Sequence, residues 1–307
     1  MRVLFFGITQ FAVKGLKHLI NKGYTPVGVV VIALANQDIT NIRQICTNQN
    51  IPVYCFNDIN NEQFIEIVQN ELKPDLLLAF TFSQKLKPEL YNLAKYAINM
   101  HPSYLPDYRG NNPYFWTIAN GETSTGVSFH FLNENFDEGD IIAQEEVPIL
   151  PDDTCGQVIA RQEPVALKLL DSILDKCARQ EVLPRMEQVA GTFKKSPKPT
   201  VKDLFIHWEK NSKEIIDRIR ALNPYTGAYT QFKNVVLAIY KASITQYASA
   251  ETPGTIIAFA PEGPIIKTGD SAITIKILTV GKKYLLSGND FIEYEKVQIG
   301  DKFKTWE

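Results

Sequence analysis

Two polar side chains stand two residues apart near the end of an apolar run, Ala97 to His101. If this run is a strand, Asn99 and His101 project from one face, because residues two apart in a strand share a face. A neutral imidazole can take a proton from an attacking amine and return it to the leaving group. An amide can donate a hydrogen bond to the oxygen that becomes negative in a tetrahedral intermediate. The pair therefore supplies parts for acyl transfer.

A carboxylate near this pair would orient the imidazole or stabilise its charged form. Asp137 is the leading candidate, because it lies in the turn-like segment Phe136 to Asp140 between two strand-like runs. Taken singly, a histidine at a strand end is often structural, and an aspartate beside a glycine is usually a turn former. The residue types thus indicate a reaction class and leave formyl transfer and hydrolysis both open.

The elements that would position these residues alternate between strand and helix. The expected order is strand Val3 to Phe6, a helix from Thr9 or Gln10 to Gly23, strand Val27 to Ile32, helix Asn41 to Asn48, strand Pro52 to Tyr54, helix Asn61 to Leu72, strand Asp75 to Phe80 and strand Ala97 to His101. Repeated βα units predict the α/β class, with a Rossmann-like, mostly parallel, doubly wound sheet. Pro102 places His101 at the carboxyl end of its strand, where open α/β sheets form ligand crevices. Gly7 lacks a GxGxxG spacing, so we predict no NAD or FAD.

The pattern changes after about residue 126. The runs 126–131 and 141–149 predict a hairpin at the sheet edge, and 155–180 predicts a long helix that Pro164 should kink. The basic, proline-bearing stretch 193–200 marks the best domain boundary. Beyond it, Asn211 and Glu214 favour a helix start, and short strand-like runs indicate a small β-rich domain. We therefore predict a catalytic domain at 1–193, a linker at 194–203 and a second domain at 204–307.

Composition limits the partners. Hydrophobic residues make up 45% and charged residues 21%, as is typical of globular proteins. The formal net charge of −2 weakens a nucleic-acid function without excluding a local basic patch. The four cysteines form no CxxC pair, which predicts no metal site, no disulfide framework and a cytoplasmic setting. No run approaches the ~18 apolar residues of a membrane span, so no membrane partner is expected.

A family resemblance makes the site more specific. Asn99-Met100-His101-Pro102-Ser103-Tyr104-Leu105-Pro106, followed by Arg109-Gly110, resembles the N-x-H-x-S-x-L-P signature of the formyltetrahydrofolate-dependent transferases, and Asp137-Glu138-Gly139 resembles their D-x-G. The resemblance implies an enzyme of one-carbon metabolism that transfers a formyl group from 10-formyltetrahydrofolate to an amine, without a metal. It also implies an OB-like C-terminal domain and extends over nearly the whole chain.

The resemblance assigns roles to individual residues. The implied catalytic residues are Asn99, His101 and Asp137. The expected folate contacts are Phe80, Phe82, Ser83, Leu105, Asn135 and Asp137. The expected contacts to the amine substrate are Ser103, Pro106, Arg109 and Gly110. Arg109 could contact a phosphate or a folate carboxylate, or equally be an ordinary loop arginine.

Three branches of this family differ in the amine. Glycinamide ribonucleotide transformylases share the His130-Phe131 pattern but normally lack a C-terminal domain. Methionyl-tRNA formyltransferases resemble the chain around Ile215 to Pro224. They grip the acceptor stem with a basic insertion, whereas Ala33 to Asp38 holds no basic residue and 204–307 carries 13 Lys and Arg against 11 Asp and Glu. Asn120 to Val127, with His130, resembles the aminoarabinose-pathway formyltransferase more closely.

We therefore expect the acceptor to be the amino group of a nucleotide-linked 4-amino sugar. Methionyl-tRNA formyltransferase is the alternative, so tRNA is not excluded as a partner. Formyltetrahydrofolate hydrolase is the alternative of another reaction class. Such hydrolases usually carry an N-terminal regulatory domain, whereas this chain begins directly with the first expected strand. A homodimer is left open.

Overall fold

The computed structural model describes residues 1–32, 39–189, 191, 193–281 and 284–305. The chain divides into two compact units: the first is Met1–Pro113, Thr125–Pro148 and Ile159–Ser196, and the second is Tyr114–Ser124, Ile149–Val158 and Pro197–Glu307. Segments 114–124 and 149–158 therefore group with the C-terminal residues. The limits 1–193, 194–203 and 204–307 stay a prediction. The segment Ala33 to Asp38, in which the lack of basic residues bears on the expected substrate, lies outside the described residues.

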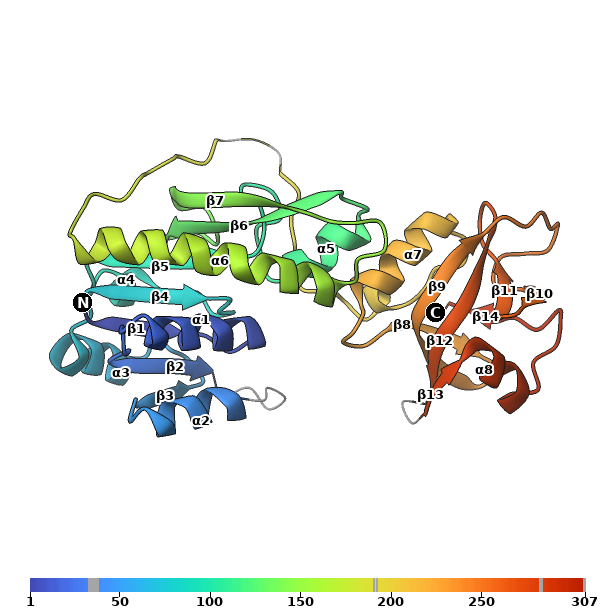
Figure 1. Ribbon diagram of the computed structural model, residues 1–307, viewed down its shortest axis with the longest axis horizontal. Coiled ribbons are helices and arrows are strands. Elements are labelled where there is room, and N and C mark those ends of the chain that lie inside the picture. Colours follow the sequence, from blue (N-terminus) through green and yellow to red (C-terminus); the bar gives the residue numbers. More distant parts are fainter. Residues whose placement is uncertain (33–38, 190, 192, 282–283, 306–307) are drawn as a thin grey trace. The chain divides into compact units, whose positions relative to one another are not determined.

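The elements up to residue 178 follow the expected alternation (Figure 1). They are β1 (Val3–Phe6), α1 (Gln10–Asn21), β2 (Gly28–Ile32), α2 (Thr40–Asn48), β3 (Val53–Phe56), α3 (Glu62–Ile67) with the π-helical turn Val68–Leu72, β4 (Leu76–Phe80), α4 (Pro88–Tyr91), β5 (Tyr96–His101), α5 (Pro113–Ala119), β6 (Ser124–Phe131), β7 (Ile141–Pro148) and α6 (Cys155–Ala178). The Thr9 side chain caps α1 by accepting the Ala12 N–H, which explains why the helix starts there. Pro164 lies inside α6, which continues past it to Ala178.

The strands of the first unit form one sheet in the order β3-β2-β1-β4-β5-β6-β7 within the described ranges. The pairs β2–β3, β1–β2, β1–β4 and β4–β5 are parallel, and β6 runs antiparallel to β5. The sheet is therefore mostly parallel, as predicted, and its strand order reverses beside β1. The carboxyl ends of β4 and β5 lie at one edge, where α/β sheets form ligand crevices.

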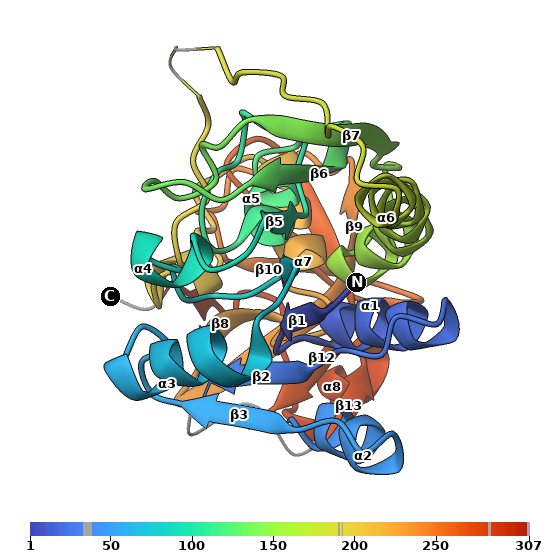
Figure 2. The same cartoon turned by 90° about the vertical axis from the view of Figure 1, so that its left-hand side faces the viewer.

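Helices cover both faces of this sheet, with α3 and α4 on one side and α1, α2 and α6 on the other (Figure 2). Alternation along the strands divides the apolar side chains between the two layers. On the α3 and α4 side, Leu4 and Leu77 pack with Phe64 and Leu90 in one buried cluster. On the opposite side, Phe11 of α1 contacts the ring of Phe80 edge-on. Burial on both faces explains the continuously apolar strands.

The second unit contains an antiparallel sheet. Its elements are the 3₁₀ turn Lys202–Leu204, α7 (Ser212–Ala221), β8 (Ala228–Phe232), β9 (Val235–Thr245), β10 (Ile256–Ala260), β11 (Gly263–Lys267), β12 (Ala272–Val280), β13 (Tyr284–Ser287), α8 (Gly288–Tyr294) and β14 (Phe303–Lys304). The strand path runs β10-β11-β12-β9-β8-β14, and a bridge from Thr255 to Lys302 brings its two ends together. The prediction of a Rossmann-like sheet followed by a smaller β-rich domain is therefore confirmed.

Candidate active site

Neighbouring strands place three polar side chains together at the sheet. Asn99 and His101 project from β5, and the antiparallel register sets Asn99 opposite His130 of β6. Directly opposed residues of an antiparallel pair have Cβ atoms about 4.5–5.5 Å apart, so these side chains are within reach of one another. His101 and His130 are buried, with 4% and 1% of their surfaces exposed. The alternation of β5 thus places the predicted pair as expected.

A tight turn brings Asp137 to the same place. Asp137 adopts a left-handed backbone conformation with φ of 56°, which aspartate tolerates better than most residues. A Cβ atom at Gly139 would lie 1.8 Å from the Phe131 carbonyl oxygen, so only glycine fits at this position without a shift of the backbone. The Gly110 N–H donates to Asp137 Oδ2 at 2.9 Å and fixes one carboxylate oxygen.

The other carboxylate oxygen of Asp137 is the point where the site converges. Oδ1 lies 3.2 Å from Asn99 Nδ2 and accepts a hydrogen bond from it. The same oxygen is 3.5 Å from His101 Nδ1 and 3.4 Å from His130 Nε2. The structure therefore brings the three residues predicted to be catalytic into one cluster, and His130 joins them.

Electrostatics favour an ionised carboxylate beside a neutral imidazole. Burial lowers the pKa of His101, and this outweighs the opposite influences of Asp137 and the Tyr108 carbonyl. Burial alone would raise the pKa of Asp137, but the neighbouring imidazoles and the Gly110 N–H hold it below its ordinary value. At neutral pH the cluster therefore contains a base and a fixed negative charge.

The hydrogen bonds of His101 determine which nitrogen can accept a proton. Nε2 lies 2.9 Å from the Tyr108 carbonyl oxygen, which can only accept, so Nε2 carries the hydrogen. Nδ1 of the neutral ring then has a free lone pair on the side of Asp137. Once protonated, the imidazolium can donate from Nε2 to Tyr108 and from Nδ1 to Asp137. The ring is thus suited to take up and release one proton.

A polar network supports the Asp137 turn from outside. Gln188 Nε2 donates to the carbonyl oxygens of Asp137 and Gly139 at 2.9 and 2.7 Å. Arg109 donates to Gln188 Oε1 at 2.7 Å and to Glu138 at 3.1 Å, so its guanidinium is engaged within the protein. The sequence pointed to neither Gln188 nor a role for His130 in the site. The alternating run 126–131 marks His130 as a strand residue, but its position opposite Asn99 depends on the pairing of β5 with β6, and nothing near Gln188 in the sequence marks it.

The residues expected to contact folate occupy two neighbouring loops and the core. Lys85, in the loop after β4, lies over the ring of Phe136, 5.9 Å from its centroid, so the loops 81–87 and 133–137 are adjacent. Ser83 and Asn135 are exposed there, and Phe82 is partly buried. Phe80 and Leu105 are buried, with 0% and 1% exposed, and their side chains contribute to packing.

The residues expected to contact the amine substrate form the loop after β5. Ser103 is buried and donates from Oγ to the Asp107 carbonyl oxygen at 2.7 Å, while its own carbonyl accepts from Ser128. Gly110 contacts Asp137 as described above, and Pro106 is partly buried. The structure thus places Gly110 and Arg109 beside the cluster and uses Ser103 within the loop.

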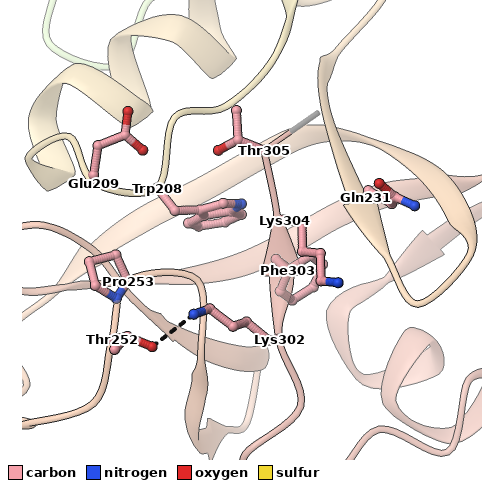
Figure 3. A pocket seen from close by; sticks show the side chains of 9 residues that line it. All are labelled: Trp208, Glu209, Gln231, Thr252, Pro253, Lys302, Phe303, Lys304 and Thr305. Carbon is pink, nitrogen blue, oxygen red and sulfur yellow. Dashed lines mark hydrogen bonds between the residues drawn. The ribbon is translucent and has the colours of Figure 1, made fainter. Parts of the chain in front are cut away.

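The second unit contains a separate open hollow of about 690 Å³ (Figure 3). Trp208, Gln231 and Phe303 line it with Lys302 and Lys304, and Lys302 donates to Thr252. It holds no histidine or cysteine among its lining residues, so we find no acyl-transfer constellation there. The described residues also include no cluster of three or more potential metal ligands. No described helix has the length and apolarity needed to cross a membrane.

Comparisons with known proteins agree with the two-part organisation. Residues 1–174 match the family model "Formyl transferase", and residues 198–295 match "Formyl transferase, C-terminal domain". The methionyl-tRNA formyltransferase of Pelotomaculum thermopropionicum is 31% identical over 300 residues, covering 95% of each chain.

Solved structures share the fold. An N-formyltransferase from Helicobacter canadensis, in complex with folinic acid and dTDP-3-aminofucose, is 20% identical with a TM-score of 0.67 and covers 90% of this chain and 98% of its own. HypX from Aquifex aeolicus, in complex with tetrahydrofolic acid, is 18% identical with a TM-score of 0.66. The alignment covers 100% of this chain and 51% of HypX, so this chain spans about half the length of that protein.

Proposed function

The chain belongs to the formyl transferase family, and we propose that it transfers the formyl group of 10-formyltetrahydrofolate to a primary amine through Asn99, His101 and Asp137. The observation that carries the proposal is the convergence of Asn99 Nδ2 and His101 Nδ1 on one carboxylate oxygen of Asp137, at 3.2 and 3.5 Å. Acyl transfer needs a base, an oxyanion donor and a group that stabilises the protonated base, and these three residues supply one each.

In the proposed reaction, His101 Nδ1 removes a proton from the amine as the amine nitrogen bonds to the formyl carbon. The Asn99 amide donates to the formyl oxygen, which becomes negative in the tetrahedral intermediate. Asp137 stabilises the imidazolium. His101 then returns its proton to N10 of the folate as the bond between that nitrogen and the formyl carbon breaks. The products are the formylated amine and tetrahydrofolate, and the enzyme returns to its starting protonation.

The two adjacent loops 81–87 and 133–137 support folate as the co-substrate. They border the carboxyl end of β4 and the Asp137 turn, and they expose Ser83, Asn135 and Phe136, of which 50% of the residue surface is accessible. This combination of polar groups and an aromatic face suits a ligand with a planar heteroaromatic ring. The Helicobacter canadensis neighbour binds folinic acid, and that observation is consistent with the same co-substrate here.

For the acceptor we propose a nucleotide-linked amino sugar. Support comes from charge: residues 204–307 carry 13 Lys and Arg against 11 Asp and Glu, and the sequence of segment 33–38 contains no Lys or Arg. A protein that binds tRNA is expected to neutralise several phosphates with basic side chains. A small acceptor requires fewer such contacts.

Methionyl-tRNA is the second candidate acceptor. The Pelotomaculum thermopropionicum enzyme, named for that substrate, aligns with 95% of this chain, including the C-terminal residues. The second unit also exposes Lys302 and Lys304 at its hollow (Figure 3). These observations justify testing tRNA beside the sugars.

The experiment supplies 10-formyltetrahydrofolate with charged initiator tRNA, or with a panel of nucleotide-linked 3-amino and 4-amino sugars, and measures the formylated product. We expect one sugar to be formylated with much the higher kcat/KM. Efficient formylation of the tRNA and none of the sugars would overturn the proposed acceptor while leaving formyl transfer intact. Release of formate at an equal rate with and without amine would overturn formyl transfer and indicate a hydrolase.

A further inference from the structure

The amide of Asn99 is held by two acceptors in the described site. Its nitrogen lies 3.2 Å from Asp137 Oδ1 and 3.1 Å from His130 Nε2. An amide nitrogen has two hydrogens, so it can donate to both at once. The amide oxygen would meet a carboxylate and an imidazole lone pair in the same positions. These contacts therefore determine which end of the amide faces the cluster.

The state of His130 follows from its other ring nitrogen. His130 Nδ1 lies 2.8 Å from the Phe131 carbonyl oxygen, which can only accept, so Nδ1 carries the hydrogen. Nε2 of the neutral ring then presents a lone pair toward Asn99. His130 Nε2 also lies 3.4 Å from Asp137 Oδ1, and the Asn99 amide nitrogen is within hydrogen-bond distance of both atoms.

We propose that His130 is a positioning residue that orients the amide of Asn99 for formyl transfer. With the Phe131 carbonyl fixing its tautomer, His130 accepts one Asn99 hydrogen and keeps the nitrogen end of the amide turned to the reacting side. The other Asn99 hydrogen points to Asp137 Oδ1 in the free enzyme, and it becomes available to the formyl oxygen when the His101 imidazolium donates to that carboxylate oxygen. Without this acceptor the amide can rotate and present its oxygen, which would repel the developing oxyanion. His130 itself touches neither substrate in this scheme. The inference rests on the proposed function, because it assigns Asn99 the oxyanion.

Substituting His130 by asparagine or by glutamine distinguishes the roles of its two ring nitrogens. The side chain of His130→Asn can replace the group at Nδ1 but does not reach the position of Nε2. The side chain of His130→Gln is one carbon longer and can place an acceptor oxygen near that position. Both variants are polar and similar in size, and their thermal unfolding curves should be compared first to show that both fold. They therefore form a matched pair.

We expect His130→Asn to lower kcat by about tenfold, as for the loss of one hydrogen bond in the transition state, with unchanged KM for both substrates. His130→Gln should recover most of that loss. In the Asn99→Ala background, His130→Asn should cause no further decrease, because the amide that it orients is gone.

The outcomes distinguish this inference from the proposed function. Equal activities of His130→Asn and His130→Gln, or a full additional loss in the Asn99→Ala background, would overturn the positioning role. A change in KM without a change in kcat would also overturn it and assign His130 to substrate binding. Parental turnover in Asn99→Ala alone would contradict the proposed function instead.

Discussion

At His101, burial and a neighbouring carboxylate act in opposite directions on one ring. Burial lowers its pKa and keeps it a neutral base, while Asp137 favours the imidazolium that forms during the reaction. The free base must be neutral to react, so kcat/KM should fall as the pH drops through the pKa of His101. The acid limb of the pH–rate profile therefore reports this residue.

Asp137→Asn should move that acid limb to lower pH. The substitution removes the negative charge that raises the pKa of His101, so the ring stays neutral to a lower pH. The rate on the plateau should fall by about a hundredfold or more, because the imidazolium is no longer stabilised. The measurement is kcat/KM against pH for parent and variant. An acid limb that moves to higher pH would contradict the assigned coupling.

A substitution of Gln188 tests whether its hydrogen bonds position the Asp137 turn. Gln188→Glu replaces the nitrogen that donates to the Asp137 and Gly139 carbonyls with an oxygen that cannot donate when ionised. We expect about tenfold lower kcat and a free energy of unfolding lower by about 1–3 kcal/mol, because two carbonyls lose their donor. Urea unfolding and steady-state rates check this. Parental values for both would show that the network does not position the turn.

The sequence predicts these residues unevenly. Asn99 and His101 follow from the two-residue period of a strand and the stop at Pro102. Asp137 becomes specific only through family resemblance, because a turn aspartate is common. His130 faces the site through the pairing of β5 with β6, and that register is not visible in one strand. Gln188 lies 49 positions after Gly139 in the sequence, and its hydrogen bond to the turn forms only when the chain folds.

At the scale of elements, the hairpin β6–β7 positions Asp137. The Phe131 N–H donates to the Asp140 carbonyl oxygen at 2.9 Å and closes the connection, and Gly139 passes directly against the Phe131 carbonyl. The alternating runs predicted this hairpin and most of the helices up to residue 178. The short α4 and α5 were not predicted, since four and seven residues carry little periodic signal.

Gly139→Ala should disrupt the turn. The added Cβ meets a backbone oxygen that cannot move without breaking the hairpin, so the Asp137 carboxylate should shift. We expect at least about tenfold lower kcat, together with about 1–3 kcal/mol of destabilisation. Gly23→Ala is the control: its φ of 83° costs about 1–2 kcal/mol, but its Cβ meets nothing within 4 Å. Equal activity in the two variants would contradict the role of the turn.

At the scale of the whole molecule, the comparisons confirm the family and the class of folate-dependent N-formyltransferase. Fold class could be predicted from the sequence because βα repetition is a local pattern. The acceptor could not, because it depends on side chains that meet only around a bound substrate. Net charge is the one global property that bears on it, and the value of −2 favours a small molecule over a polyanion.

Salt dependence measures that preference directly. With the nucleotide-linked sugar as acceptor, KM should rise by no more than about threefold between about 50 and about 200 mM salt, because few phosphates are contacted. A tRNA held by six to ten phosphate contacts would lose roughly a thousandfold or more in affinity over that range. A steep salt slope for the preferred acceptor would therefore favour tRNA.

The most direct test of the central claim follows the formyl group itself. Labelled 10-formyltetrahydrofolate is mixed with amine acceptor and excess enzyme in a single turnover, and the label is counted in product amine and in formate. We predict label in the amine for the parent, and a loss of at least about a hundredfold in rate for His101→Ala, with unchanged folate affinity. Label appearing in formate without need of amine, or a normal rate in His101→Ala, would contradict the account.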